Sequence, residues 1–220
     1  MQEQKQFVPK GAFPKMSYIL TVPADADFEK EQLPLLVFLH GAGERGEDPQ
    51  ILNTVVTIPR IFEENPKYRE KRVITLSPQC PDGLVWGHML LPVRELIEQI
   101  AEQYHVDRDR ISITGYSMGG FGTWDMICTY PELFSAAAPI CGGGMSWRVG
   151  VLTGLPIRAF HGAVDSVVPP VYSECMVNAV NNVGGHATLT VFPGVDHGSW
   201  IPAYETTDVI DWLLHQTRRK

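Results

Sequence analysis

The stretch Arg110-Ile-Ser-Ile-Thr-Gly-Tyr-Ser-Met-Gly-Gly-Phe-Gly-Thr-Trp124 decides the fold. Its first half alternates isoleucine with small polar residues, which is typical of a β-strand. Its second half leads into apolar residues that recur at helical spacing as far as Tyr130. Between the two halves lies the pattern Gly115-x-Ser117-x-Gly119. Because glycine has no Cβ atom, it allows the close backbone contacts of a strand that reverses at once into a helix.

The serine at the apex of this turn is a candidate nucleophile. We expect its hydroxyl to be exposed, with the N-terminus of the following helix behind it. That helix end offers unpaired N–H groups and a partial positive charge, which stabilise a developing oxyanion. The pattern alone occurs by chance in many proteins, and the alternative is an ordinary glycine-rich turn. The flanking strand and helix patterns, together with the chain order of the other candidates, favour a catalytic Ser117.

The composition predicts a single domain over residues 1–220, with residues 1–15 as a loose N-terminal lead-in. Of the 220 residues, 44% are hydrophobic, which is enough for one core. The formal net charge of −7 disfavours nucleic acid and anionic membranes as partners. No apolar run approaches the roughly 18 residues that a membrane span needs, so we expect no membrane insertion. The N-terminus lacks the apolar core of a secretory signal, which predicts a cytoplasmic location if Met1 is the natural start; a trimmed chain would read the same.

The four cysteines are scattered along the chain without a C-x-x-C pair or a histidine-rich neighbourhood. We interpret them as structural thiols, because buried free cysteines are common and disulfides are rare in the cytosol. We therefore expect no metal site, and the chemistry predicted below needs no cofactor. The cysteines are Cys80, Cys128, Cys141 and Cys175.

Strand-like and helix-like segments alternate along the chain. The runs at residues 35–39 and 136–140 are short and continuously apolar, as in strands buried on both faces of a parallel sheet. Intervening segments such as residues 52–64 have helical spacing. This alternation predicts an α/β fold, a mostly parallel doubly wound sheet flanked by helices. Only 14 residues run from Gly142 to Leu155, so we expect no large lid domain and a fairly open site.

A serine nucleophile needs a base, and the base needs an acid that fixes its tautomer. Asp165 follows Ser117 by 48 residues and lies just past a predicted strand. His197 comes 32 residues later, in a glycine-flanked loop between the last predicted strand and the last helix. This order of serine, acid and histidine is that of the α/β-hydrolases. The alternative for Asp165 is a turn-forming aspartate.

Two other residues compete for these roles. His161 ends a strand beside Gly162, and we interpret it as a buried, hydrogen-bonded histidine. Asp196 adjoins the predicted base, but adjacent residues in an extended loop usually point apart. The predicted catalytic residues are Ser117, Asp165 and His197.

An oxyanion hole needs two N–H donors near the scissile carbonyl. One predicted donor is the backbone of Met118, the residue after the nucleophile. The other lies in the loop His40-Gly-Ala-Gly-Glu-Arg-Gly46, where the flanking glycines favour Ala42. A simple glycine turn is the alternative.

Five further residues are candidates for substrate contact. Glu44 and Arg45 adjoin the oxyanion loop, where a structural ion pair between them is the alternative. Three tryptophans lie near predicted strand exits and fit a core position equally well: Trp86, Trp147 and Trp200.

With these motifs in place, the chain resembles the small carboxylesterases related to dienelactone hydrolase and the phospholipase/carboxylesterase group. The loop at residues 40–46 is especially similar to that of esterases known as predicted peptidases, which are close to feruloyl and polyhydroxybutyrate-depolymerase-like enzymes. The turn at residues 115–124 is similar to theirs too, as are residues 77–81, residues 131–134 and the blocks around Asp165 and His197.

The resemblance covers about Tyr18 to the C-terminus. It implies the α/β-hydrolase fold, a catalytic triad of Ser117, Asp165 and His197, and an oxyanion hole formed by Ala42 and Met118. It does not indicate the natural ester.

The sequence therefore predicts a serine carboxylesterase that hydrolyses short-chain or aryl esters through an acyl-enzyme, with a small-molecule ester as its partner. A peptidase of the prolyl-oligopeptidase type shares the fold and triad, but such enzymes usually gate the site with another domain, for which 220 residues leave no room. A non-catalytic binding protein with this fold would require a lost triad member, and every expected member is present.

Overall fold

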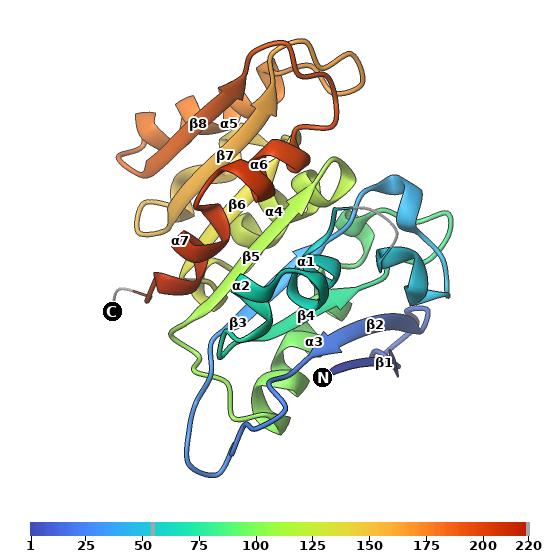
Figure 1. Ribbon diagram of the computed structural model, residues 1–220. Helices are drawn as coiled ribbons and strands as arrows, with labels where there is room; N and C mark the ends of the chain where they lie inside the picture. The colour runs from blue at the N-terminus through green and yellow to red at the C-terminus, as the bar shows by residue number, and fades with distance from the viewer. Residues whose placement is uncertain (54–55, 219–220) are drawn as a thin grey trace.

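One sheet runs through the molecule in the computed structural model, which describes residues 1–53 and 56–218 (Figure 1). Within those residues, eight strands form the sheet in the order β1-β2-β4-β3-β5-β6-β7-β8. β1 pairs antiparallel with β2, β2 pairs antiparallel with β4, and the other pairs are parallel. The strands are β1 Gln2–Phe7, β2 Met16–Thr21, β3 Leu35–Leu39, β4 Ile74–Pro78, β5 Ile111–Tyr116, β6 Ala136–Ile140, β7 Pro156–Gly162 and β8 His186–Phe192.

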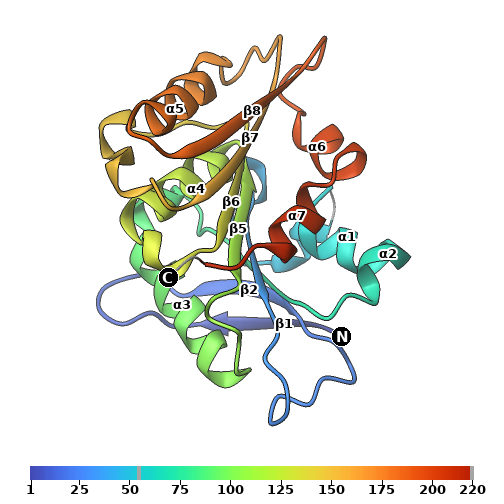
Figure 2. The same cartoon turned by 90° about the vertical axis from the view of Figure 1, so that its left-hand side faces the viewer.

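Helices cover both faces of the sheet (Figure 2). α3, α4 and α5 pack on one face and α1, α2, α6 and α7 on the other, and each face has its own apolar core. The predicted fold class, a mostly parallel doubly wound sheet flanked by helices, is confirmed. The helices are α1 Ile58–Glu64, α2 Pro66–Arg69, α3 Leu90–Gln103, α4 Met118–Thr129, α5 Val171–Asn182, α6 Trp200–Thr206 and α7 Val209–His215.

The central parallel strands are short and fully buried, because helices cover both of their faces. Their register pairs Leu39 with Gly115 and Tyr116 with Ile140, so β3, β5 and β6 end level with one another. Ligands of open α/β sheets bind beyond the carboxyl ends of the strands. The candidate residues follow these strand ends.

The N-terminal segment is more regular than the sequence predicts. Residues 1–15 were expected to form a loose lead-in, but Gln2–Phe7 form β1 and pair with β2 in full register. The strand is mostly polar and shows no core pattern, so its sequence gives little sign of it. Backbone pairing to β2 and burial of Phe7 stabilise it instead.

The predicted helix over residues 52–64 is shorter in the structure. Its residues 54–55 lie outside the described part of the chain, residues 49–53 form a 3₁₀ helix, and α1 begins at Ile58. Pro59 occupies the first turn of α1, where a missing N–H costs no intrahelical hydrogen bond.

Between β6 and β7 the chain forms one short 3₁₀ helix, η5 (Ser146–Val151), as the missing lid insertion predicts. Among residues 1–53 and 56–218, every helix falls short of the length and hydropathy that a membrane crossing requires.

Candidate active site

Ser117 lies at the tight turn between β5 and α4. Its backbone has φ 55° and ψ −119°, a conformation that is rare for residues other than glycine. The turn is crowded, since a Cβ atom at Gly115 or Gly119 would lie 2.5 or 1.9 Å from the carbonyl oxygen of Leu39. The two glycines are therefore a steric requirement, and the strained backbone holds the serine side chain at the carboxyl edge of the sheet.

The structure brings the three predicted catalytic residues into one hydrogen-bonded chain. Nε2 of His197 lies 2.8 Å from the hydroxyl oxygen of Ser117. On the other side of the ring, Nδ1 lies 2.9 Å from Oδ2 and 3.1 Å from Oδ1 of Asp165. When Nδ1–H donates to the carboxylate, Nε2 is the nitrogen that can accept a proton from the serine.

The Asp165 carboxylate is held firmly in place. The residue is 5% exposed, and its Oδ1 accepts the backbone N–H groups of Val167 at 3.0 Å and Val168 at 2.8 Å. These bonds satisfy the carboxylate in a buried setting and fix the direction of Oδ2 toward His197.

His161 is buried and hydrogen-bonded, as the sequence predicts, and it also borders the acid. Its Nε2 lies 2.8 Å from the carbonyl oxygen of Val168 and 3.3 Å from Oδ2 of Asp165, and its Nδ1 lies 2.7 Å from the Ser173 hydroxyl. Because a carbonyl and a carboxylate both accept, Nε2 carries the proton. The sequence reasoning missed this contact, for which the four-residue spacing of His161 and Asp165 was the available signal.

Asp196, the alternative acid, directs its carboxylate to Ser166. Its carboxylate accepts the Ser166 N–H at 2.7 Å and the Ser166 hydroxyl at 3.0 Å. These bonds lower the pKa of Asp196 and tie the loop of His197 to the loop after β7.

The two predicted oxyanion donors begin two neighbouring helices. Ala42 is the first residue of the 3₁₀ helix η1 (Ala42–Glu44), and Met118 is the first residue of α4. N–H groups in the first turn of a helix have no intrahelical acceptor. Because β3 and β5 are adjacent in the sheet, both helix starts lie at the same edge. The arrangement suits an anionic oxygen.

The oxyanion loop, residues 40–46, is anchored to the end of β4. Nε2 of the fully buried His40 accepts the Cys80 N–H at 2.9 Å, and the Trp86 indole N–H donates to the His40 carbonyl at 2.9 Å. Burial lowers the pKa of His40 to about 4, so the ring is neutral and Nε2 is free to accept.

Glu44 and Arg45 each hold this loop from within. Arg45 donates to the carbonyl of Ala42 at 2.9 Å and to a second carbonyl in the loop after β4. The Glu44 carboxyl is buried beside Tyr116 and lies 3.8 Å from Nδ1 of His40, and burial raises its pKa. Glu44 and Arg45 thus make separate contacts in place of the ion pair that was the alternative. Contact of either side chain with substrate stays a prediction.

The three predicted tryptophans have different environments. Trp200 stacks on Tyr116 with ring centroids 4.4 Å apart and meets the His197 ring edge-on at 5.7 Å, so it borders the site. Trp86 is 1% exposed and packs under the oxyanion loop, which fits the core alternative, although its edge lines a surface hollow. Trp147 is 81% exposed in η5, and its contact with substrate stays a prediction.

Cys141 contacts the backbone of Ser117, a position that the sequence reasoning did not single out. Its sulfur accepts the Ser117 N–H at 3.3 Å, and one ligating atom each from Cys141, Asp165 and His197 lie within 4.8 Å of one another. Such a set could approach a cation. However, burial raises the pKa of the thiol to about 12, and the other two side chains share a hydrogen bond. A protonated thiol is a poor metal ligand, so the set fits proton transfer better.

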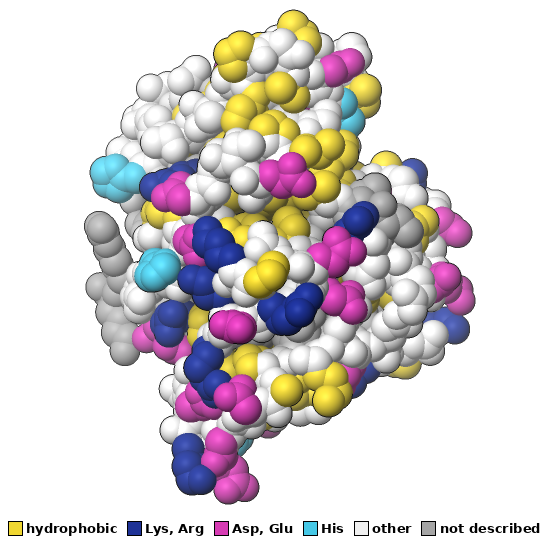
Figure 3. All heavy atoms as spheres, viewed as in Figure 1, with side chains coloured by type: hydrophobic (Ala, Val, Ile, Leu, Met, Phe, Trp, Pro, Cys, Tyr) yellow, Lys and Arg dark blue, Asp and Glu magenta, His cyan; other side chains and the backbone are white. Residues whose placement is uncertain are grey.

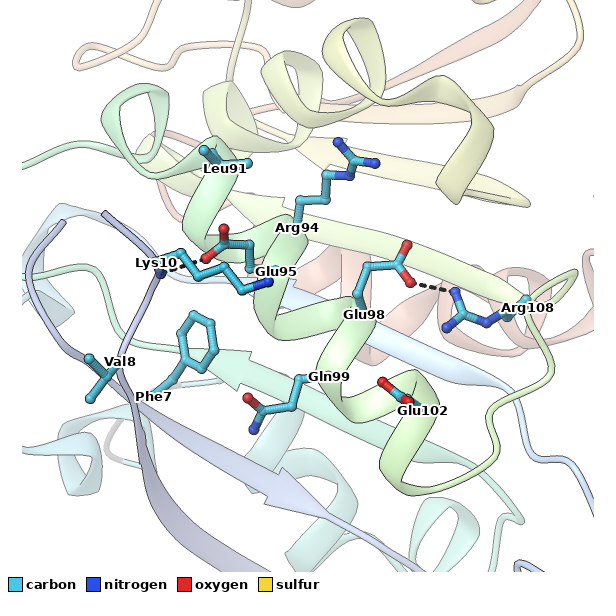
Figure 4. Close-up of a pocket in the computed structure, with 10 residues that line it drawn as sticks. All are labelled: Phe7, Val8, Lys10, Leu91, Arg94, Glu95, Glu98, Gln99, Glu102 and Arg108. Carbon is cyan, nitrogen blue, oxygen red and sulfur yellow. Dashed lines mark hydrogen bonds and ion pairs between the residues drawn. The ribbon is translucent and has the colours of Figure 1, made fainter. Parts of the chain in front are cut away.

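Two surface hollows bear on where a ligand binds. One of about 520 Å³ lies between the N-terminal segment and α3, and its lining includes Glu95, Glu98 and Arg108 (Figure 4). The other, about 410 Å³, lies between the loop after β4 and α4 and is lined in part by Met118, the neighbour of the nucleophile.

The rim of the site is partly apolar. In Figure 3, hydrophobic side chains gather over α6 and the nearby ends of β7 and β8, while charges of both signs cover the lower half of this face. Exposed apolar residues beyond those strands include Val164, Val167 and Ile201.

The strained serine turn between strand and helix, its hydrogen-bonded histidine and aspartate, and the sheet order together define an α/β-hydrolase fold. The family model of the phospholipases/carboxylesterases matches residues 88–212, a segment that contains all three of these residues. The chain belongs to that family.

Solved and curated relatives agree with this placement. The chain superposes on the crystal structure of a thermostable esterase with a TM-score of 0.89 and 36% identity, covering 99% of this chain and 63% of that one. It is 38% identical over 53 residues to poly(3-hydroxyalkanoate) depolymerase C of Paucimonas lemoignei, 24% of this chain and 13% of the relative. It is 25% identical over 126 residues to a bifunctional acetylxylan esterase/xylanase of Neocallimastix patriciarum, 50% of this chain and 19% of the relative. The chain thus spans less than two thirds of each of these proteins.

Proposed function

We propose that this protein is a serine carboxylesterase in which Ser117 is the nucleophile, His197 the base and Asp165 the residue that orients the base. The observation that carries the proposal is the continuous chain of contacts from the serine hydroxyl to the carboxylate, at 2.8 and 2.9 Å. Ser117 also lies at a strained turn between a strand and a helix, the position that presents the side chain of a nucleophile to substrate.

The reaction follows from this geometry. The Ser117 oxygen attacks the ester carbonyl as its proton passes to Nε2 of His197, and Asp165 stabilises the imidazolium that forms. The N–H groups of Ala42 and Met118 hold the negative oxygen of the tetrahedral intermediate. His197 then protonates the departing alcohol. It next activates a water molecule, which releases the acid and restores the serine.

The preferred substrates are small esters with a short acyl or aryl group. The segment between β6 and β7, where many hydrolases carry a lid, holds only η5, so the edge of the sheet is open. The solved and curated relatives with ester-cleaving names support an ester over an amide, since the similar peptidase structures share only the fold, at 16% and 15% identity.

Hydrolysis of a p-nitrophenyl ester series from acetate to octanoate, with methyl ferulate beside it, tests the proposal. We expect turnover of the esters with acyl chains up to hexanoate, and its loss in Ser117→Ala. The matched control Ser146→Ala, in η5, should keep the wild-type rate.

An inert wild type, or a Ser117→Ala variant with full activity, would refute the proposal. Faster cleavage of a proline-ended aminoacyl amide than of the aryl ester would replace it with the peptidase alternative. Full inertness together with specific ligand binding would favour the binding-protein alternative.

A further inference from the structure

The hollow of about 410 Å³ beside α4 has the size and composition of a ligand subsite. Small-molecule sites are typically about 300–1,000 Å³ in volume and mostly apolar. Apolar groups dominate its lining, and Asp125 is the one charged residue among those that line it. The lining residues are Val85, Trp86, Gly87, Met118, Phe121, Gly122 and Asp125.

The walls of this hollow are pre-formed. A Cβ atom at Gly122 would lie 2.5 Å from Cβ of Trp86, so the 3₁₀ helix η3 (Trp86–His88) packs tightly on α4. The Trp86 indole is fixed by its hydrogen bond to the His40 carbonyl. Ligand binding therefore needs little rearrangement of these walls.

One face of α4 leads from the nucleophile into the hollow. Met118, Phe121, Gly122 and Asp125 are spaced by three and four residues, so they share one side of the helix. Met118 directly follows Ser117. Met118 is therefore the lining residue that adjoins Ser117 in the chain.

The sheet order decides which half of an ester the hollow receives. β5 carries the nucleophile, with β3 and β4 on one side and β6, β7 and β8 on the other. His197 follows β8, so the alcohol that it protonates departs on that side. The hollow lies between the loop after β4 and α4, and its Trp86 wall bonds the carbonyl of His40 directly after β3, on the opposite side of β5.

We propose that this hollow is the acyl-binding subsite and that it takes an apolar, uncharged acyl group longer than acetyl. The inference rests on the proposed esterase function and adds the half of the substrate that controls specificity. Each methylene buried there contributes about four-fold in binding. Hexanoate esters should accordingly exceed acetate esters in kcat/KM by at least about ten-fold.

Asp125 sets the charge preference of the subsite. Its Oδ2 would lie 3.5 Å from a Cβ atom on Gly87, at the wall of the hollow, while its Oδ1 is 3.9 Å from Nη1 of Arg148. An acyl group that ends in a carboxylate would approach this second carboxylate in a partly buried setting. Succinyl monoesters should therefore be poor substrates, and Asp125→Asn should improve them relative to butanoate esters.

The test narrows the hollow from its exposed side. Val85 is 42% exposed, so Val85→Trp adds bulk at the wall without replacing a core residue, and Gly87→Leu is an independent second variant. Val183→Trp, at the end of α5, is the matched control at a similarly exposed valine. The readout is kcat/KM for p-nitrophenyl acetate, butanoate and hexanoate, and for ethyl, phenyl and p-nitrophenyl acetates.

We expect Val85→Trp and Gly87→Leu to lower the hexanoate-to-acetate ratio by about ten-fold while the ranking of the three acetates stays unchanged. An unchanged acyl ratio in both variants, or an altered ranking of the acetates instead, would overturn the inference. Hydrolysis of p-nitrophenyl acetate by wild type and Ser117→Ala in the same assay tests the esterase proposal by itself. Failure of that proposal is therefore distinguished from failure of the acyl-subsite inference.

Discussion

The oxyanion loop and the base loop, residues 193–199, meet at Ser117 but are built differently. The oxyanion loop begins at the fully buried His40 and is tied by three hydrogen bonds to the loop that follows β4. The base loop is exposed or half-buried except at Ser199, and the His197 side chain itself retains 20% of its surface. It is supported by the end of β7 and the loop that follows: its carbonyls pack closely on Gly162, and Asp196 accepts two bonds from Ser166.

This difference matches what the proposed mechanism requires of each loop. Stabilising an oxyanion requires donors whose positions are fixed before the charge develops, because reorganisation would cost free energy at that moment. The base must instead meet the alcohol and water, so its loop borders solvent. We infer that changes in the oxyanion loop act through backbone position, whereas changes in the base loop act through single side-chain contacts.

The largest expected effect is a difference in kcat between variants of Asp165 and Asp196, the two aspartates near His197. In Asp165→Asn the backbone N–H groups of Val167 and Val168 hold the amide oxygen, so an NH2 donor faces Nδ1 of His197. This favours the wrong histidine tautomer, and kcat should fall by about 10⁴-fold. Asp196→Asn keeps the side-chain shape and should lower kcat by less than about ten-fold, because Asp196 bonds Ser166. Steady-state kinetics on p-nitrophenyl acetate measures both, and equal losses would contradict the assignment.

A smaller effect tests the rigidity of the oxyanion loop with two glycines. A Cβ atom at Gly41 would lie 2.9 Å from the Tyr116 ring and 3.2 Å from the Glu44 carboxyl, whereas one at Gly43 would meet nothing within 4 Å. Gly41→Ala should displace the Ala42 N–H and lower kcat by about 10²-fold, the cost of losing one oxyanion donor.

Gly43→Ala is the matched control in the same loop, and we expect it to retain wild-type kcat. If Gly41→Ala and Gly43→Ala both retained wild-type kcat, the inference that the oxyanion loop is rigid would be contradicted.

The same contrast explains which features the sequence could predict. Gly115 and Gly119 are a steric requirement, so the turn that places Ser117 at its apex is visible in the sequence alone. The positions of Asp165 and His197 follow from chain order and strand ends. These are properties of local sequence and topology.

Contacts between distant segments leave no such signal. Cys141 behind the serine and the bond of Trp86 to the His40 carbonyl depend on how separate strand ends meet. The polar strand Gln2–Phe7 is stabilised by backbone pairing to β2. This pairing needs no alternation of apolar residues, so no such pattern marks the strand in the sequence. For the same reason, the sequence could not separate the buried Trp86 from the site-bordering Trp200.

The smallest expected effect concerns stability at low pH. Burial lowers the pKa of His40 to about 4 in the folded protein, below its ordinary value of 6.5. Between pH 4 and pH 6.5, His40 binds a proton in the unfolded chain but stays neutral in the folded protein. Its contribution to the free energy of unfolding is therefore fully present above about pH 6.5 and is lost as the pH falls toward 4. From pH 7 to pH 5 this amounts to about 2 kcal/mol.

Urea unfolding of wild type and His40→Gln at the two pH values measures this. We expect the free energy of unfolding to fall more in wild type than in the variant. The raised pKa of Glu44 acts in the opposite sense in both proteins, so it cancels in the difference. An equal pH dependence in the two proteins would show that His40 is not the buried neutral anchor of the loop.

Covalent labelling with a fluorophosphonate, followed by mass mapping of the modified peptide, identifies the activated nucleophile. We expect one adduct per chain on Ser117, formed rapidly in wild type and in Asp196→Asn and strongly slowed in Asp165→Asn. A folded wild-type protein that stays unlabelled, or that carries the adduct on another residue, would contradict the assignment of Ser117 as the activated nucleophile.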